Sequence, residues 1–270
     1  MMDGTLARLI DQTALRMGRK DAILFLKRGR LESRINYRSL QQISDRVANG
    51  LMEMGLQRGE RVILFMPKSI EQVLIHLGIQ KVGAISVILN PGFKKDEMDY
   101  FLRDTDANIV VVGKREEALI HSVDPRRQIF TIDTEVPFFE ERLFRGISSK
   151  RSHPEGNPQD PAVLIYTSGT TGQPKGAILT QQNLVQDAKN IIQIGEIKET
   201  DVLCHALPLF HVHGLCFALH TALITGAKIV MCDEFSHETV IDILSRREGE
   251  LACTMFMGVP TMYLLSLIHI

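Results

Sequence analysis

Short, mostly apolar runs alternate along this chain with segments of helical periodicity, and this alternation constrains the fold more than any other feature of the sequence. Apolar runs at residues 61–65, 85–89 and 108–112 are separated by segments such as 69–81, in which apolar side chains recur at helical spacing. Strands that are apolar throughout are typical of parallel sheets that helices cover on both faces. The sequence therefore predicts an α/β fold of two layered subdomains, each a largely parallel sheet flanked by helices.

Residues 145–161 break this pattern, because Ser, Pro, Gly and Asn are mixed there with scattered charges and show little periodicity. We interpret this segment as a linker or a surface crossing. It predicts a first subdomain over residues 1–155 and a second over residues 156–270. The other predicted elements are helices near 40–51, 95–103, 181–194 and 237–247, and strands near 162–166, 202–206, 228–231 and 252–256.

Charge and apolar content argue against several classes of protein. The formal net charge of -1 at pH 7 gives no support to a nucleic-acid or anionic-membrane partner. No run approaches the ~18 consecutive apolar residues of a membrane span, and the first residues show no basic segment leading into an apolar signal core. The four cysteines are too widely spaced for a C-x-x-C pair and are expected to be reduced, buried thiols. We therefore expect a cytoplasmic protein without an integral membrane segment.

The stretch from Tyr166 to Gly176 carries the clearest chemistry. Residues 167–176 contain four Ser or Thr hydroxyls, three glycines and one lysine, directly after an apolar strand. Glycine permits positive φ and leaves backbone N–H groups unshielded, so such a loop can fold around an anion. The hydroxyls can donate to phosphate oxygens, and the lysine supplies a mobile positive charge. The candidate phosphate-binding residues are Thr167, Ser168, Gly169, Thr170, Thr171, Gly172 and Lys175.

Two other interpretations of this stretch compete with phosphate binding of this kind. A Walker P-loop does not fit, because counting from Gly169 puts Pro174 where that motif needs its second glycine. An ordinary Ser/Thr/Gly loop between strands is the plainer alternative, although such loops rarely combine this density of hydroxyls with Pro-Lys-Gly after a strand.

The run Tyr-Thr-Ser-Gly-Thr-Thr-Gly-Gln-Pro-Lys-Gly resembles the phosphate-binding signature of adenylate-forming enzymes. Residues 177–184 resemble the strand and helix start that follow in those proteins, with Gln181 where many members have histidine. Residues 206–215 (Ala-Leu-Pro-Leu-Phe-His-Val-His-Gly-Leu) resemble the next motif of the family. Residues 89–93 and 257–263 resemble, respectively, a turn before a surface helix and the step bordering the acyl pocket. The chain is thus identified as the N-terminal portion of an AMP-forming acyl-CoA synthetase, with the fold of that superfamily's large N-terminal domain.

The resemblance implies a reaction in two steps. A carboxylate attacks the α-phosphorus of ATP, releasing pyrophosphate and leaving an acyl-adenylate, and the thiol of coenzyme A then displaces AMP to form a thioester. The implied cofactors are ATP, Mg²⁺ and coenzyme A, and the implied partner is a small carboxylic acid. Lys175 and His211 are the implied catalytic residues, with Lys175 holding phosphates and His211 beside the reacting carboxylate.

The histidines near His211 need separate interpretation. His211 and His213 could form half of a metal site, but no carboxylate or cysteine stands at a supporting spacing, so no metal ligand is predicted. His213 and His220 are expected to be core histidines. Gly214 is expected to let the following helix start close by, with its N-terminal amides toward an anion.

Relatives also have parts that find no counterpart in this sequence. These are a Tyr-Gly-x-Thr-Glu-type segment that helps to hold magnesium, an aspartate that holds the ribose hydroxyls, and a mobile C-terminal domain with a catalytic lysine. Residues 264–270 form an apolar run, and the last six resemble one reading frame of a transposase-type sequencing adapter. We therefore expect a truncated or misjoined coding sequence, incomplete at its C-terminus and inactive as a ligase by itself.

Two alternative functions stay open. A related adenylating enzyme, such as a peptide-synthetase adenylation domain or a luciferase-like protein, would share the loop, although the His-Val-His-Gly element resembles acyl-CoA synthetases more closely. A non-catalytic nucleotide-binding module would bind nucleotide without pyrophosphate exchange. The sequence fixes neither the oligomeric state nor the acid, which could be a fatty acid, malonate or another. Malonate would need a cation for its second carboxylate, and Lys228 is the only Lys or Arg between residues 202 and 231.

Overall fold

The computed structural model describes residues 4–150, 156–167 and 173–268, which fall into two compact units. Unit 1 comprises Met1–Arg8 and Gln42–Asn183, and unit 2 comprises Leu9–Gln41 and Leu184–Ile270. The units differ from the two consecutive subdomains expected from the sequence, because the chain passes between them three times. These passages fall within helices α1 (Leu6–Met17), α2 (Tyr37–Glu53) and α6 (Gln181–Ile194).

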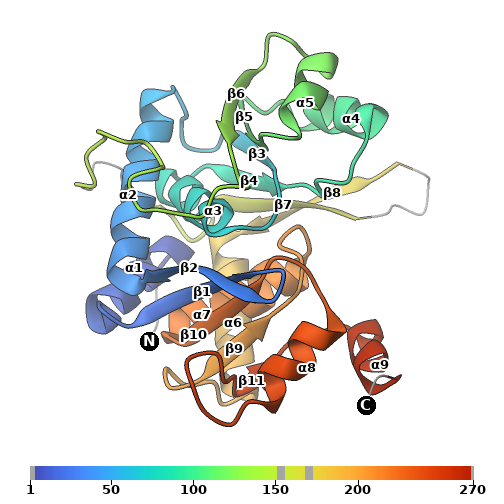
Figure 1. Ribbon diagram of the computed structural model, residues 1–270. Coiled ribbons are helices and arrows are strands. Elements are labelled where there is room, and N and C mark those ends of the chain that lie inside the picture. The colour runs from blue at the N-terminus through green and yellow to red at the C-terminus, as the bar shows by residue number, and fades with distance from the viewer. Residues whose placement is uncertain (1–3, 151–155, 168–172, 269–270) are drawn as a thin grey trace. The chain divides into compact units, whose positions relative to one another are not determined.

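Unit 1 contains one six-stranded sheet (Figure 1). In sheet order its strands are β6 (Gln128–Ile132), β5 (Ile109–Gly113), β3 (Arg61–Phe65), β4 (Ile85–Ile88), β7 (Pro161–Thr167) and β8 (Lys175–Thr180). All neighbours are parallel except β7 and β8, which form an antiparallel hairpin at one edge. The predicted largely parallel sheet is therefore confirmed, with an antiparallel edge strand added.

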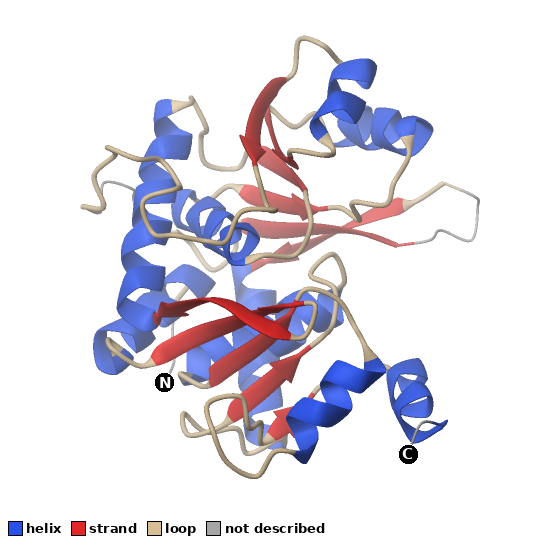
Figure 2. Cartoon of the chain, viewed as in Figure 1, coloured by secondary structure: helices blue, strands red, loops and turns tan. Residues whose placement is uncertain are grey.

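Helices connect the parallel strands of unit 1 and cover both faces of the sheet (Figure 2). The connecting helices are α3 (Ile70–Val82), α4 (Lys95–Thr105) and α5 (Glu117–Val123). Helices α4 and α5 pack with alternate residues of β3, β4, β5 and β7 into one apolar cluster. Helix α3 lies against the opposite face, where Ser86 of β4 contacts His76 and Gln80. This alternation follows from the period of two along a strand.

Helix α3 is buried on all sides, whereas its sequence predicted a single apolar face. All thirteen of its residues are buried, including Glu71, His76 and Lys81. It begins after Ser69, whose side chain accepts a hydrogen bond from the backbone N–H of Gln72. Buried polar side chains need partners, and α3 finds them in neighbouring segments of unit 1.

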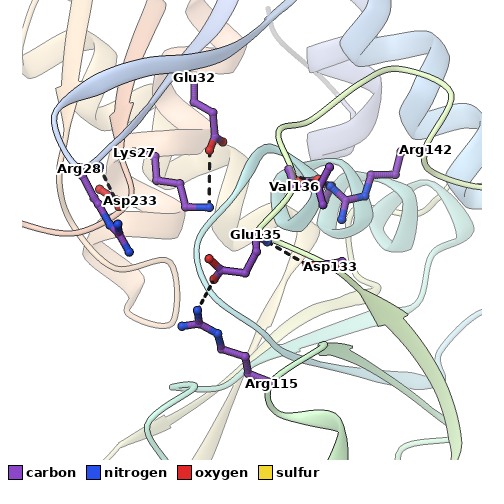
Figure 3. A network of polar contacts seen from close by, with 10 residues as sticks. Lys27, Arg28, Glu32, Arg115, Asp133, Glu135, Val136, Arg142 and Asp233 are labelled. Atoms are coloured by element: carbon purple, nitrogen blue, oxygen red, sulfur yellow. Dashed lines mark hydrogen bonds and ion pairs between the residues drawn. The ribbon is translucent and has the colours of Figure 1, made fainter.

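One such partner is Arg142, which lies in the irregular segment after β6. Its guanidinium donates to Glu71 of α3 at 2.9 Å and to the carbonyl oxygen of Val136 at 2.8 Å. Figure 3 shows Arg142 with Val136, and also the ion pair at 3.2 Å between Glu135 of the same segment and Arg115, which follows β5. The irregular segment is therefore attached to unit 1 by charged side chains at several points.

Unit 2 contains one five-stranded sheet. In sheet order its strands are β11 (Met255–Phe256), β9 (Val202–His205), β10 (Lys228–Cys232), β1 (Asp21–Lys27) and β2 (Arg30–Asn36). Neighbours are parallel except β1 and β2, which form an antiparallel hairpin. Besides its parts of α1, α2 and α6, this unit contains a π-helix, η1 (His213–His220), and the helices α7 (Thr221–Thr225), α8 (His237–Ser245) and α9 (Pro260–Ile268).

Helix α8 covers one face of this sheet, packing with alternate residues of β1, β9 and β10. Cys204, Cys216 and Cys232 are buried, as expected, while Cys253 is partly exposed. Within the described residues of the whole chain, no helix combines the length and the apolar character that crossing a membrane requires.

The β1–β2 hairpin, which the sequence analysis did not anticipate, turns at Arg28 and Gly29, both with positive φ. The backbone N–H of Arg28 donates to the carboxylate of Asp233 at 3.1 Å, after the end of β10. Across the hairpin, Lys27 and Glu32 form an ion pair at 3.5 Å, which Figure 3 also shows.

Candidate functional site

The described residues of the predicted phosphate-binding stretch belong to the β7–β8 hairpin of unit 1. Thr167 is the last residue of β7 and Lys175 the first of β8, and the two face each other in the register. The Thr167 hydroxyl donates to the Lys175 carbonyl oxygen at 3.4 Å. The expectation that a strand precedes the stretch is confirmed. The intervening candidates Ser168, Gly169, Thr170, Thr171 and Gly172 lie outside the described residues.

The side chains of Thr167 and Lys175 are both exposed at this end of the hairpin. Residues directly opposite each other in an antiparallel pair project from the same face of the sheet. The side chains of Thr167 and Lys175 therefore leave the backbone side by side at the last pair of the register. Such a pair can meet an anion with a point charge and a hydrogen bond together.

Helix α4 contacts both strands of the hairpin near this end. The Tyr100 hydroxyl donates to the carbonyl oxygen of Pro174 at 2.8 Å. The Tyr166 hydroxyl donates to the carboxylate of Asp104, and the Tyr166 ring lies 4.5 Å from that of Phe101 between centroids. The sequence alone does not predict these contacts, which join residues far apart in the chain. The only signal for them was that positions 100 and 104 lie on one face of a helix.

The segment around His211 belongs to unit 2 and connects β9 to η1. His205, at the end of β9, is buried, and its Nε2 lies 2.8 Å from the Gly214 carbonyl oxygen. Because a carbonyl oxygen only accepts, this nitrogen carries the proton. A Cβ on Gly214 would lie 2.1 Å from the carbonyl oxygen of Pro208, so only glycine fits here. The prediction that Gly214 lets a helix start close by is confirmed.

His211 itself keeps an exposed side chain, and its ring lies 4.6 Å from the ring of Phe210. Partial burial lowers the pKa of His211 below its usual value, so the imidazole is mainly neutral at pH 7. A neutral imidazole offers one donor and one acceptor. Its backbone carbonyl accepts from the Leu215 N–H at 3.0 Å, at the start of η1.

The neighbouring histidines differ in their surroundings. His220 is fully buried, as predicted for a core histidine. His213 is only partly buried, with its ring 5.7 Å from that of Phe217. Among the residues that the structure describes, no group of three or more His, Cys, Asp or Glu side chains could hold a metal ion.

Comparison with known families decides the assignment. The model of the AMP-binding enzyme family matches residues 10–269 of this chain. The chain belongs to the AMP-binding enzyme family. The sequence-based resemblance to adenylate-forming enzymes is thereby confirmed.

Relatives of this AMP-binding enzyme include the acyl-CoA ligase sidI of Aspergillus fumigatus. The two are 29% identical over 286 residues, covering 97% of this chain and 47% of sidI. The crystal structure of ATP-bound MatB from Rhodopseudomonas palustris matches with a TM-score of 0.84 and 29% identity, over 97% of this chain and 51% of MatB.

The predicted fold class is also confirmed by structural likeness. The inhibitor-bound N-terminal domain of FACL13 from Mycobacterium tuberculosis matches with a TM-score of 0.86 and 23% identity, over 98% of this chain and 65% of that one. This chain therefore has the fold of such N-terminal domains. It spans about half the length of sidI and MatB.

Proposed function

We propose that this chain supplies the ATP-phosphate-binding part of an AMP-forming acyl-CoA ligase. Such a ligase converts a carboxylic acid and ATP to an acyl-adenylate, with release of pyrophosphate, and then transfers the acyl group to the thiol of coenzyme A. The observation that carries the proposal is the glycine- and hydroxyl-rich connection of the β7–β8 hairpin, which ends with Thr167 beside Lys175 in a chain of the AMP-binding family.

The phosphates of ATP are the proposed ligand of this connection. Lys175 would neutralise phosphate charge, and the Thr167 hydroxyl would turn from the Lys175 carbonyl oxygen to donate to a phosphate oxygen. Ser168, Gly169, Thr170, Thr171 and Gly172 would complete the cradle with hydroxyls and backbone N–H groups. Both the acid and ATP are anions, so their reaction requires fixed positive charge and hydrogen-bond donors. When bound, Mg²⁺ would supply further neutralisation of the phosphates.

His211 is proposed to interact with the carboxylate of the acid substrate. Its lowered pKa favours the neutral imidazole, which can donate one hydrogen bond to a carboxylate oxygen. The buried bond from His205 to Gly214 holds the two ends of the connecting segment that carries this residue. This arrangement supports a role for His211 in positioning the acid, whose class (fatty, malonate or another) the panel of acids below would identify.

A non-catalytic nucleotide-binding module is the second candidate. Both candidates share nucleotide binding, and the exchange of pyrophosphate into ATP distinguishes them. We propose that the 270-residue chain by itself forms no acyl-CoA, because full-length relatives would supply further groups for the reaction.

The first experiment measures ATP binding to the chain by calorimetry. Lys175→Ala should weaken ATP binding roughly 10- to 100-fold, because a hydrogen bond to a charged group contributes about 1.5–3 kcal/mol. Lys198→Ala, which removes another exposed lysine, is the matched control and should bind ATP as the wild type does. Equal affinities of Lys175→Ala and the wild type would refute the phosphate-loop assignment.

The second experiment separates a ligase from a binding module. The coding sequence is extended from its source DNA, and the longer protein is assayed for acid-dependent exchange of pyrophosphate into ATP with a panel of carboxylic acids. Exchange would support the ligase and name its acid. Tight ATP binding without any exchange would favour the module, and thioester formation by the 270-residue chain alone would overturn the expected inactivity.

A further inference from the structure

Two tyrosines and an aspartate contact the β7–β8 hairpin next to Lys175, and the proposed function gives them no role. Tyr100 and Asp104 lie one turn apart on α4, and Tyr166 is the penultimate residue of β7. One tyrosine hydroxyl bond joins each side of the hairpin to α4. Tyr100 donates to the residue before β8, and Tyr166 of β7 donates to Asp104 of α4.

The bond from Tyr100 fixes the peptide group that enters β8. Its hydroxyl lies 2.8 Å from the carbonyl oxygen of Pro174, and that carbonyl is bonded directly to the nitrogen of Lys175. Proline has no N–H of its own to donate. The hydrogen bond from the Tyr100 hydroxyl therefore restrains the peptide group between Pro174 and Lys175, which directly precedes the Cα that carries the Lys175 side chain.

The bond from Tyr166 restrains the other strand. Its hydroxyl donates to the Asp104 carboxylate, and its ring packs on Phe101, which is 1% exposed. Burial and the hydrogen bond to Asp104 raise the pKa of Tyr166, and burial and the same carboxylate raise the pKa of Tyr100. Both hydroxyls consequently stay protonated near neutral pH and remain donors.

The hairpin needs such support because β8 is an edge strand. It pairs only with β7, and its first four residues are exposed. The pair of Thr167 with Lys175 is the last of the register, and the ends of a two-stranded ribbon fray readily. Helix α4 thus contacts the hairpin at its end, where β8 pairs with a strand on one side only and the last register pair can fray.

We propose that Tyr100, and Tyr166 together with Asp104, are positioning residues that fix the hairpin on α4 and so set where Lys175 meets the phosphates of ATP. This inference rests on the proposed phosphate-binding function. It adds a second set of residues, which touch no phosphate and act through the backbone of the hairpin.

The test compares nucleotide affinities of the 270-residue chain and its variants. Tyr100→Phe and Tyr166→Phe each remove one hydroxyl, and each should weaken ATP binding about 2- to 10-fold, the range expected for one hydrogen bond. Affinity for AMP, which lacks the β- and γ-phosphates, should change less than about 2-fold on the same scale. A role in general stability would instead weaken both nucleotides or neither.

Asp104 provides a conservative rescue. Asp104→Asn keeps an oxygen that accepts from Tyr166 and should retain the wild-type affinity for ATP or exceed it, because a negative charge is removed. Asp104→Ala removes the acceptor and should resemble Tyr166→Phe. Equal affinities of Asp104→Ala and Asp104→Asn for ATP would contradict the proposal.

Tyr37→Phe is the matched control for the loss of a tyrosine hydroxyl. This hydroxyl donates to a backbone carbonyl, that of Ala227, at 2.7 Å inside unit 2. The variant should lower stability while leaving the ratio of ATP to AMP affinity unchanged. If it shifts that ratio as far as Tyr100→Phe does, the positioning role is refuted.

Amide hydrogen exchange decides the question independently of nucleotide. In Tyr100→Phe the amides of residues 175–180 should exchange about 2- to 10-fold faster, while those of β3 and β5 stay unchanged. Unchanged exchange in β8 would overturn the inference even if Lys175→Ala loses ATP binding. Conversely, exchange in β8 could be faster while Lys175→Ala binds ATP as the wild type does. That result would support the contact between Tyr100 and the hairpin and refute the proposed function.

Discussion

The ion pair between Lys81 and Asp45 inside unit 1 allows a sharp test of how α3 is stabilised. The ammonium nitrogen and the carboxylate oxygen lie 2.6 Å apart, and the two side chains are 2% and 1% exposed. Lys81→Met removes the cation and leaves a carboxylate in a site closed to water. Because breaking a buried ion pair by removing one partner costs about 3–5 kcal/mol, the free energy of unfolding should fall by that amount.

The assay is urea unfolding of four proteins followed by circular dichroism. They are the wild type, Lys81→Met, Asp45→Leu and the double variant. Each single variant should lose about 3–5 kcal/mol, whereas the double variant should recover most of the loss, because two apolar side chains of similar volume replace the pair. Costs that simply add in the double variant would refute this reasoning.

A surface pair of similar length serves as the control. Arg103 and Asp99 lie 2.8 Å apart on α4, with 79% and 39% of their side chains exposed. Arg103→Met should cost less than about 1 kcal/mol, since water solvates the remaining carboxylate. If Lys81→Met proves no more costly than Arg103→Met, burial does not determine the stability effect as argued.

Three further changes have expected outcomes in the same unfolding assay. Gly214→Ala would place a Cβ 2.1 Å from the Pro208 carbonyl oxygen, so it should cost about 1–3 kcal/mol, and wild-type stability would contradict the close approach. Burial lowers the pKa of His76 from 6.5 to about 3, so the unfolded chain binds the proton more tightly. Stability should therefore fall by about 1.4 kcal/mol per unit as the pH drops from about 6 toward about 4. His76→Asn should flatten that slope relative to the wild type. Ser69→Ala removes the acceptor of the Gln72 N–H at 3.2 Å and should cost about 1 kcal/mol, with Ser69→Gly costing less.

The sequence predicts best those elements whose apolar pattern is local. The strand at 61–65 and the helix at 181–194 have the predicted bounds, since each pattern ends at clear polar or turn residues. Helix α3 shows the limit of this approach. Its polar residues look like a solvated face, but partners such as Asp45 and Arg142 lie far from it in the sequence and allow complete burial.

Other features have weak or no local signals. The β1–β2 hairpin turns at Arg28 and Gly29, where charged residues at both strand ends obscure the alternation. The compact units depend on packing between segments far apart in the chain, so the composition of residues 145–161 does not mark their boundary. The π-helix η1 follows a recognisable motif, but nothing in that motif distinguishes it from an α-helix.

For the candidate site, the sequence predicts the chemistry of the hairpin connection but not its support. A lysine among hydroxyls and glycines after a strand indicates anion binding directly. The contact of Tyr100 joins residues 74 positions apart in the chain, and that of Tyr166 joins residues 62 positions apart. Only tertiary structure brings such pairs together, so positioning residues are the part of a site that a motif omits.

Gln181 shows how a departure from the family pattern becomes understandable. It is 1% exposed, its Oε1 accepts from the backbone N–H of Leu6 at 3.0 Å, and its Nε2 donates to the side chain of Gln80 at 2.8 Å. The first N–H groups of a helix have no partner within it, so Gln181 satisfies the start of α1. A histidine at this position would, as a neutral imidazole, also have one donor and one acceptor and could fill both roles. An imidazolium has no acceptor, so glutamine keeps this buried connection at acidic pH, where histidine would lose it.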